Sequence, residues 1–566
     1  MRRSNHLHIA FVSLGLALTA NACGDASDGG AFDSASTSAG VTGGGFGETG
    51  DSSGGEASSG TDSAGDSGDG GGFVYDMGEP PPPPEEEEEG DFRVPKASGR
   101  FVYSANEVTD RLAVIDSADL SIEVVSVARG PSWIEAIATP NPDAGAVAVM
   151  SPGEDEVSLV RTADTGVTTI TLGDIAEGTN AMDSSPNARW ALAYHDVDLP
   201  SDPVGSDQEI TLIDTQNNDE ATWLTVGAHP RSVHWSPDST RLYVVSDDGV
   251  NVVDLTATEL DDKPPLTAVG PGLDPDTIEI HVSPTQGQAI ARVQDQPWLL
   301  VVDLETGEST QIDLPAYPTD LDVSADGSFA IAMLPRKSGS SLVEVPLPVA
   351  GPLDFVETSL GDEYLGVSSI APDGDTMLLY TTVDPWALDG DEAPLGDPRQ
   401  RMTIARREGA TWDNQYTMFT EVPIRAVGMS PDSVNAILLH DAAPELNSTA
   451  PWPYTLLDIS SVFPVRKVQM VQAKPTAVLF TPDGSRAALS IRDEEGTIKR
   501  ADIVNLGSFI VEQLILGSPP QGLGYVEATD KIFISQEHGS GAITFVSADG
   551  SVATATGFEL NSEVKD

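Results

Sequence analysis

Cysteine is almost absent from this chain of 566 residues, which contains only Cys23. A single cysteine excludes every disulfide within the chain. Basic residues are also scarce: 29 lysines and arginines stand against 89 aspartates and glutamates, for a formal net charge of −60. A field of this sign repels the phosphate backbone of nucleic acids and anionic lipid headgroups. The composition therefore argues against nucleic acid as a partner and favours cationic ligands.

The sequence also lacks the short motifs that mark common catalytic and cofactor sites. It has no Gly-x-Ser-x-Gly elbow, Walker loop, dinucleotide fingerprint, His-Glu-x-x-His pair or Cys-x-x-Cys pair. No catalytic residue and no cofactor is therefore predicted. The one long apolar run, residues 9–20, is too short to span a membrane.

Residues 1–22 have the layout of a signal peptide, because Arg2 and Arg3 precede the apolar run and Cys23 follows it closely. The arrangement resembles a bacterial lipoprotein signal, which implies cleavage before Cys23 and lipid attachment to its sulfur. An ordinary signal peptide cut near Ala22, a twin-arginine export signal and a buried structural cysteine are the alternatives. We predict export, with lipid attachment at Cys23.

Residues 23–92 differ in composition from the rest of the chain. Glycine, serine, aspartate and threonine dominate residues 24–91, and lysine and arginine are absent there. Such a segment cannot bury enough apolar surface to offset its ordering entropy, so we predict a disordered stalk. Residues 80–84 are all proline and residues 85–89 all glutamate, which predicts a stiffer, extended end. The stalk is interpreted as a tether, or as a spacer with no partner of its own.

One short turn recurs along the remaining chain. Its clearest copy runs from Thr481 to Arg486, with proline second and glycine fourth, and an apolar run to Ile491 follows directly. Proline presets φ and glycine tolerates the exit geometry, so a type I β-turn between two strands is predicted. Weaker copies recur at steps of 41 to 59 residues. They begin at Pro140, Ser185, Ser236, Ser283, Ser324, Ala371 and Ser430.

A repeat of this length with short apolar runs is typical of an all-β propeller, in which each repeat forms one four-stranded antiparallel blade. We call the four strands a to d from the axis outward. The b and c runs are continuously apolar, which predicts burial on both faces. Residues 93–566 would then form about ten repeats, in one large ring, in two smaller rings, or in a ring with extra repeats. The b strands are expected near residues 101, 146, 190, 241, 289, 329, 377, 436, 487 and 532.

Closure of the ring is expected from pairing of the two ends of this region, within one blade or between adjacent blades, because closure removes exposed sheet edges. The first repeat lacks a clear a strand unless Phe92 to Val94 provides it.

Turns of the Ser-Pro-Asp-Gly type, followed by runs such as Arg241 to Val245 and Val250 to Leu255, resemble the YVTN-type and TolB-like relatives of WD-repeat propellers. The resemblance covers residues 100–558 as a repeat pattern. It implies the propeller fold and leaves the function open, since propellers serve binding, scaffolding and several unrelated chemistries. A lactonase-like branch exists among these relatives, but none of its catalytic residues can be placed on this sequence.

The longest insertions lie between strands b and c, at residues 195–208, 383–401 and 440–453, with a shorter one at 335–340. In a four-stranded meander these connections emerge at the same end of every blade, and variable loops on a rigid scaffold commonly bind there. We therefore predict a binding face that contains His195, Asp196, Asp198, Asp384, Trp386, Asp389, Asp391, His440, Asp441 and Trp452.

Metal binding on this face is a weaker hypothesis. Asp389, Asp391 and Glu392 offer the oxygen ligands that calcium prefers, although their spacing matches no EF-hand and a solvated acidic surface is the simpler explanation. His195 and His440 end equivalent strands and each precedes an aspartate, which suits a transition metal. We favour the simpler interpretation, in which each histidine bonds to the backbone or to the aspartate beside it.

Aromatic residues in the insertions have two interpretations. Trp386, Trp452 and Tyr454 could stack on a sugar or peptide, or they could hold their own loops in place.

The sequence as a whole predicts an exported, lipid-anchored propeller at a bacterial cell envelope, facing the periplasm or the cell surface. Its expected role is to bind an envelope or extracellular protein, or a glycan, with the membrane contacted through Cys23 only. One alternative is a hydrolase or lactonase-like enzyme with a metal-assisted site in the central funnel. The other is a purely structural envelope protein.

Overall fold

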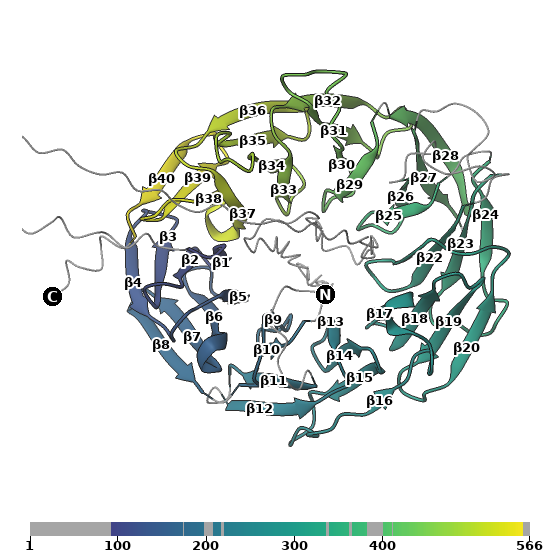
Figure 1. Ribbon diagram of the computed structural model, residues 1–566, viewed down its shortest axis with the longest axis horizontal. Coiled ribbons are helices and arrows are strands. Elements are labelled where there is room, and N and C mark those ends of the chain that lie inside the picture. Colours follow the sequence, from purple (N-terminus) through teal and green to yellow (C-terminus); the bar gives the residue numbers. More distant parts are fainter. Residues whose placement is uncertain are drawn as a thin grey trace, which may run out of the picture. The chain divides into compact units, whose positions relative to one another are not determined.

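The computed structural model describes residues 92–558, apart from residues 174, 197–207, 217–219, 336–338, 362–364, 382–399, 410 and 421. The predicted signal peptide, Cys23 and nearly all of the predicted stalk lie outside this part. Within it, ten four-stranded antiparallel sheets follow one another around a ring (Figure 1). The prediction of a propeller is therefore confirmed, with one ring of ten blades.

Each blade takes its strands from one continuous stretch of chain, and hydrogen-bonded neighbours follow sequence order. Blades 1 to 10 are numbered in chain order. The innermost, or a, strands are β1 (Lys96–Ser98), β5 (Trp133–Ile137), β9 (Ala181–Ser184), β13 (Pro230–Trp235), β17 (Ile278–Ser283), β21 (Asp320–Val323), β25 (Val367–Ile370), β29 (Ile424–Met429), β33 (Pro475–Phe480) and β37 (Pro520–Val526). The b strands are β2 (Phe101–Asn106), β6 (Gly145–Ser151), β10 (Trp190–Tyr194), β14 (Arg241–Ser246), β18 (Gln288–Val293), β22 (Phe329–Leu334), β26 (Thr376–Tyr380), β30 (Asn435–His440), β34 (Arg486–Ile491) and β38 (Lys531–Gln536).

The two outer positions of each blade complete the ring. The c strands are β3 (Arg111–Asp116), β7 (Glu156–Ala163), β11 (Glu209–Asp214), β15 (Gly249–Asp254), β19 (Trp298–Asp303), β23 (Ser341–Pro346), β27 (Gln400–Glu408), β31 (Trp452–Asp458), β35 (Arg500–Asn505) and β39 (Ala542–Ser547). The outermost, or d, strands are β4 (Ile122–Ser126), β8 (Gly166–Leu172), β12 (Glu220–Thr225), β16 (Leu266–Thr267), β20 (Ser309–Asp313), β24 (Val356–Ser359), β28 (Thr411–Thr420), β32 (Arg466–Val471), β36 (Ile510–Ile515) and β40 (Val552–Thr556). All ten predicted b strands are thus confirmed.

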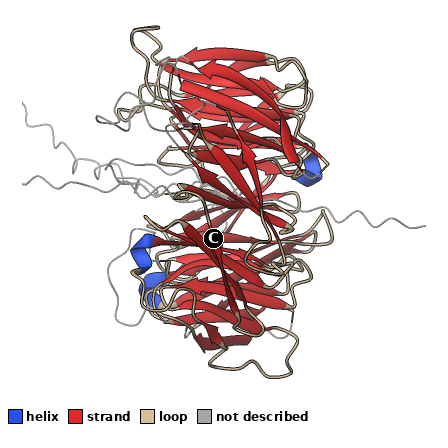
Figure 2. Cartoon of the chain, turned by 90° about the vertical axis from the view of Figure 1, so that its right-hand side faces the viewer, coloured by secondary structure: helices blue, strands red, loops and turns tan. Residues whose placement is uncertain are grey.

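Helix contributes little to the described part. It contains the short 3-10 helices η1 (Pro152–Glu154), η2 (Pro275–Thr277) and η4 (Glu527–Thr529), which appear with the strands in the edge-on view of Figure 2. A helix with the length and apolar character of a membrane span does not occur among the described residues.

The recurring turn joins strands a and b, as predicted. In its clearest copy the Gly484 N–H donates to the Thr481 carbonyl oxygen at 2.9 Å, and Gly484 has a φ of 68°. The fourth residue is left-handed in other copies too, including Ala188 at 59° and Ser433 at 58°, where no glycine relieves the strain. The Ser433 Oγ accepts a hydrogen bond from the N–H of Asp373, in the turn of the preceding blade. The turns therefore also contact one another around the ring.

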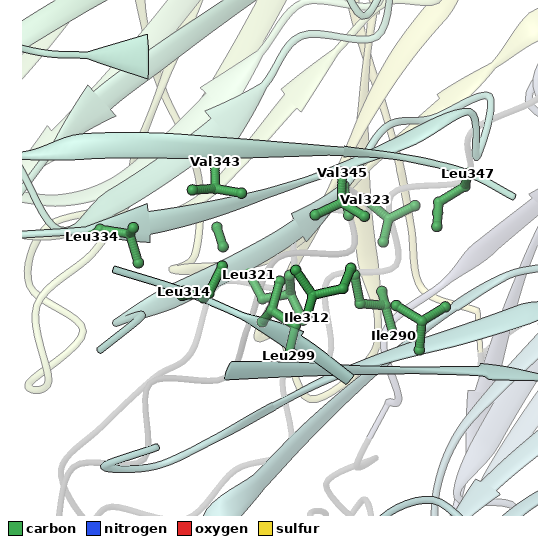
Figure 3. Packing of buried hydrophobic residues seen from close by; sticks show 13 residues of the cluster. Ile290, Leu299, Ile312, Leu314, Leu321, Val323, Leu334, Val343, Val345 and Leu347 are labelled. Atoms are coloured by element: carbon green, nitrogen blue, oxygen red, sulfur yellow. The ribbon is translucent and has the colours of Figure 1, made fainter. Parts of the chain in front are cut away.

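The hydrophobic core lies between neighbouring blades. Every residue of β6 and β30 is buried, whereas most of β36 is exposed. Figure 3 shows one interface, where Ile290 and Leu299 of blade 5 belong to the same cluster as Val343 and Val345 of blade 6. Because the inner three strands are covered on both sides, continuously apolar b and c runs are what this packing requires.

The ring closes by side-chain packing between blades 1 and 10. The rings of Phe92 and Phe558 meet edge to face, with centroids 5.4 Å apart. The Gln521 side-chain amide donates to the Phe92 carbonyl oxygen at 2.7 Å, and Lys531 donates to the Ser117 carbonyl. The expected a strand at Phe92 to Val94 is displaced, because the strand is β1 and Phe92 forms only a single bridge to β2. Closure therefore joins adjacent blades without exchange of strands.

Candidate functional site: the loop face and the inner strands

Because each blade is an antiparallel meander, its connections alternate between the two faces of the propeller. The turns between a and b and between c and d lie at one end, here the turn face, and the connections from b to c and from d to the next a lie at the other, here the loop face. All the long insertions noted in the sequence therefore emerge on the loop face. Of the predicted binding residues, those described are His195, Asp196, His440, Asp441 and Trp452. Those outside the described residues are Asp198, Asp384, Trp386, Asp389 and Asp391, together with Glu392.

His195 and His440 each form a hydrogen bond to the d-to-a connection that leads into their own blade. The His195 Nδ1 lies 2.7 Å from the carbonyl oxygen of Gly178, and the His440 Nδ1 lies 3.2 Å from that of Pro423. In both cases the carbonyl belongs to the segment just before the blade's own a strand. These contacts are the backbone bonds that the simpler sequence interpretation expected.

The tautomer of His440 follows from its partners. A carbonyl oxygen can only accept, so Nδ1 donates and Nε2 must accept from the Thr455 hydroxyl, 2.8 Å away. Burial lowers the pKa of His440 to about 4, which keeps the ring neutral. The same role in blade 10 belongs to Gln536, whose amide accepts from the Ser518 N–H and donates to Thr544. Both ring nitrogens of His440 are thus occupied by protein groups.

The other described candidates, Asp196, Asp441 and Trp452, do not converge on a common site. The backbone N–H of Asp196 donates to the Asn180 side chain at 2.6 Å, and the Asn180 amide donates back to the Asp196 carbonyl at 2.9 Å. Asp441 is exposed. Trp452 packs, half-buried, against the cluster between blades 8 and 9. Among the described residues, no group of three or more His, Cys, Asp or Glu side chains is placed to hold a metal ion.

Two shallow pockets open toward the loop face. The first, of about 300 Å³, lies between blades 9 and 10, and the second, of about 260 Å³, between blades 8 and 9. The first is lined by Leu514, Leu516, Gln536, His538, Thr544 and Thr554 among others, and the second includes Gln472, Lys499, Arg500 and Gln513. Arg500 is already paired with the buried carboxylate of Asp502 at 2.6 Å.

The a strands carry a feature that our sequence interpretation missed. Ionisable or polar side chains occupy the a strands of seven consecutive blades and meet at the interfaces between them. We call this set the inner belt. It comprises Lys96, Glu135, Asp183, His234, Glu279, His281, Asp320, Asp322 and Ser368.

The first part of the inner belt links blades 1 to 4. The Ser184 hydroxyl donates to Glu135 at 3.1 Å, and the Trp235 indole N–H donates to Asp183 at 3.0 Å. Burial raises the pKa of Glu135 to about 7, against the opposing charge of Lys96. Burial also raises the pKa of Asp183. These acids therefore bind protons far more readily than exposed carboxylates.

Blades 4 and 5 contribute the two histidines of the inner belt, His234 and His281. His281 Nε2 lies 3.0 Å from Glu279, whose second oxygen accepts from Arg292 at 2.5 Å. Burial alone would raise the pKa of Glu279, but the hydrogen bonds and charges of His281 and Arg292 outweigh it, and the pKa falls. Burial and then the charge of His281 lower the pKa of His234 to about 4.

The junction of blades 6 and 7 holds a shared proton. The Ser368 Oγ lies 2.9 Å from Asp320 and 2.5 Å from Asp322, and the Ser368 N–H donates to the same Asp320 oxygen at 2.7 Å. A hydroxyl has one proton and cannot donate to both acids. Asp320 already accepts from the N–H, so Asp322 carries a proton and donates it to Ser368, which donates to Asp320.

Burial explains why this proton is retained. Asp320 is 4% exposed, Asp322 3% and Ser368 0%. Burial raises the pKa of Asp320 to about 6, and burial together with the charge of Asp320 raises the pKa of Asp322 well above its ordinary value. Two ionised carboxylates this close in an apolar interface would repel strongly, so one stays neutral.

Comparison with known proteins adds no family. No protein-family model matches the chain, and no curated protein matches it. Among solved structures, it is similar to a eukaryotic initiation factor at 12% identity and a TM-score of 0.45, covering 72% of this chain and 94% of that one. It is also similar to the dihydro-heme d1 dehydrogenase NirN at 16% identity and a TM-score of 0.37, covering 66% and 74%. Similarities this distant carry no argument about function.

Proposed function

We propose that this protein is an exported, lipid-anchored propeller that binds an envelope or extracellular protein, or a glycan, through its loop face. The observation that carries the proposal is the uneven placement of extra chain. The two longest connections, after β10 and β26, leave the ring at the loop face. At the turn face the described a-to-b turns are short, and the longest c-to-d connection, residues 255–265, only equals the insertion after β30. A rigid scaffold with variable loops on one face is the usual design of a binding module.

The rigidity of the scaffold supports the same interpretation. The b strands that precede the insertions end in buried side chains, Tyr194, Tyr380 and His440. His440 is bonded on both ring nitrogens, so the base of its insertion is fixed. Binding loops on fixed bases lose less conformational entropy when a partner is bound.

The binding role is tested by capture of a partner from intact envelopes by chemical crosslinking. We expect the parent chain to capture one saturable partner, and a variant without residues 383–399, which stops short of β27, to lose it while its thermal unfolding stays unchanged. The matched control is Leu353→Ser, at an exposed site in the c-to-d connection of blade 6 on the turn face. Unchanged capture by the deletion variant would contradict the assignment of the binding face.

The anchor is tested separately, with the full chain and its Cys23→Ser variant. Fatty-acid labelling of the parent and loss of both label and membrane fractionation in the variant are expected. A labelled Cys23→Ser variant would refute lipid attachment at Cys23 without touching the binding role.

A further inference from the structure

The hairpin between β31 and β32, in blade 8, carries an unusual concentration of exposed apolar side chains. Phe463 is 79% exposed, Val462 67% and Val465 59%. Single apolar residues on a surface are common, but a contiguous group with an aromatic side chain at its tip marks a contact surface. The hairpin lies at the turn face, away from the predicted binding loops.

The group continues onto the neighbouring strands. Val468, on β32, is 51% exposed. Lys467 donates to the carbonyl oxygen of Phe509 at 2.8 Å, which places the next c-to-d turn beside the hairpin, and the following residue, Ile510, is 58% exposed. We call this surface the rim patch. It comprises Val462, Phe463, Val465, Arg466, Lys467, Val468 and Ile510.

The charge of the rim patch is opposite to that of the chain. Arg466 and Lys467 are both exposed, and residues 459–482 contain no acid, although acids outnumber bases 89 to 29 overall. Asp458, which precedes the hairpin, is used locally, since it accepts from the N–H groups of Ser460 and Ser461 at 3.0 and 3.1 Å. Glu512, an exposed acid on β36, lies two residues beyond Ile510 at the edge of the rim patch. At physiological salt, charges further away than about 8 Å are largely screened. A partner in contact with the Phe463 hairpin therefore meets the local positive charge of Arg466 and Lys467.

We propose that the rim patch is a second membrane contact, in which the Phe463 hairpin enters the headgroup layer of an anionic lipid surface. The inference rests on the proposed lipid anchor, which would hold the ring close to such a surface. An apolar tip followed by two cations is the pattern of interfacial membrane binders, with aromatic and aliphatic groups inserted and cations at the phosphates. The side chains at the tip, Phe463 and Val462, are the most exposed apolar side chains of the rim patch, and a deformable lipid layer accommodates such a tip better than a second rigid surface does.

A weak contact is sufficient in this arrangement. A tether converts the encounter with the membrane into an intramolecular step with a high effective concentration. The rim patch would then set the orientation of the ring relative to the membrane. Because it lies at the turn face, lipid contact leaves the loop face directed away and free for a partner.

The test is co-sedimentation with vesicles of phosphatidylcholine containing about one third phosphatidylglycerol, at physiological salt. The protein is the chain from residue 23 onward with Cys23→Ser, so that no attached lipid contributes. We expect Phe463→Ser to weaken vesicle binding about tenfold, since burial of a phenylalanine side chain accounts for at least a factor of ten in an equilibrium constant. Arg466→Gln with Lys467→Gln is expected to remove the dependence on the anionic lipid. The matched control is Leu353→Ser, at a residue that is 87% exposed on another c-to-d connection.

Three outcomes would overturn the proposal. The first is absence of vesicle binding by the parent, and the second is equal binding by the parent and Phe463→Ser. The third is self-association without lipid, seen by light scattering and lost in Phe463→Ser, which would assign the rim patch to a second copy of the chain. A second measurement guards against misfolding, because the emission of a Phe463→Trp variant should shift to the blue on addition of vesicles. Loss of lipid labelling in the full chain would remove the anchor without altering these vesicle results.

Discussion

The shared proton between Asp320 and Asp322 predicts how the stability of the ring depends on pH. Both acids have folded pKa values above their ordinary value, so the folded state binds more protons than the unfolded state. Stability is then highest below the unfolded pKa of about 3.8, falls as pH rises, and stays lowered above the folded pKa. For Asp320 the fall ends at about pH 6, and for Asp322 it continues to higher pH.

The magnitude follows from proton counting. A group that is protonated in the folded state and ionised in the unfolded state costs about 1.4 kcal/mol of unfolding free energy per pH unit. From its ordinary value of 3.8 to about 6, Asp320 alone contributes a loss of roughly 3 kcal/mol. Arg292 and Glu279 face Asp320 with opposite charges, and the Tyr380 hydroxyl faces both acids.

The perturbation is Asp322→Asn. The amide keeps a donor for the Ser368 hydroxyl but cannot ionise, so the variant should lose less stability than the parent as pH rises. Between pH 5 and pH 8 we expect the two curves to diverge by up to about 1.4 kcal/mol per pH unit, with the variant more stable at pH 8. Urea unfolding followed by tryptophan fluorescence measures the divergence. The control, Asp313→Asn, changes an exposed acid on β20.

Parallel curves for the parent and Asp322→Asn would refute the shared proton. A direct readout is the infrared carbonyl band of a protonated carboxylic acid at pH 8, above the pKa of about 7 of Glu135. The band should be weaker in Asp322→Asn than in the parent.

Three further predictions concern single contacts. Ala188→Gly should raise the free energy of unfolding by about 1 kcal/mol, because Ala188 is held left-handed at a φ of 59°; urea midpoints measure this. His440→Ala should lower it by about 1–3 kcal/mol by leaving buried partners unpaired, and His440→Gln should recover part of the loss, as the role of Gln536 in blade 10 suggests. Phe558→Ala should destabilise ring closure by about 3–5 kcal/mol, seen first as faster hydrogen exchange in β40 and β1. Equal exchange in these strands and in β22 would contradict this last expectation.

The propeller architecture could be predicted from the sequence because it depends on local features, namely turn residues and apolar strands. Turns such as Thr481 to Gly484 need proline and glycine at fixed positions, and b strands such as β34 must be apolar on both faces. The turn recurs in eight copies and the apolar b run in all ten repeats, and together they locate the ten blades. The mode of closure could not be predicted, since the contact between Phe92 and Phe558 joins residues at opposite ends of the described chain and leaves no periodic signal.

The candidate site was only partly readable. The end of the ring that carries the insertions follows from the order of strands, and this part of the prediction rests on topology alone. The role of His440 was not settled by its position, because a histidine at a strand end can bind a metal or a carbonyl oxygen. Only the positions of Pro423 and Thr455 beside the two imidazole nitrogens decide between a metal ligand and a hydrogen-bonded side chain.

The inner belt could not be predicted from single strands, because each of its members looks like an isolated polar residue. Alignment on the turns reveals a column, since Asp183, His234, His281 and Asp322 each stand two residues before the first residue of their turn. In this column Asp183 and Asp322 face the next blade, so each acid needs a partner from that blade. Trp235 supplies one for Asp183, and Ser368 supplies one for Asp322.

Such contacts distinguish one neighbour from another, which apolar packing does not. An unpaired buried acid is costly, whereas one aliphatic interface can replace another of similar volume. We infer that the column helps to fix the order of blades around a ring that has ten similar units. If so, exchange of Asp183 and His234 should destabilise the ring by more than the sum of the effects of Asp183→Asn and His234→Asn, since the exchange separates the carboxylate from the Trp235 indole N–H and places each side chain opposite the wrong neighbour. An exchange no worse than that sum would show that the column contributes only local stability.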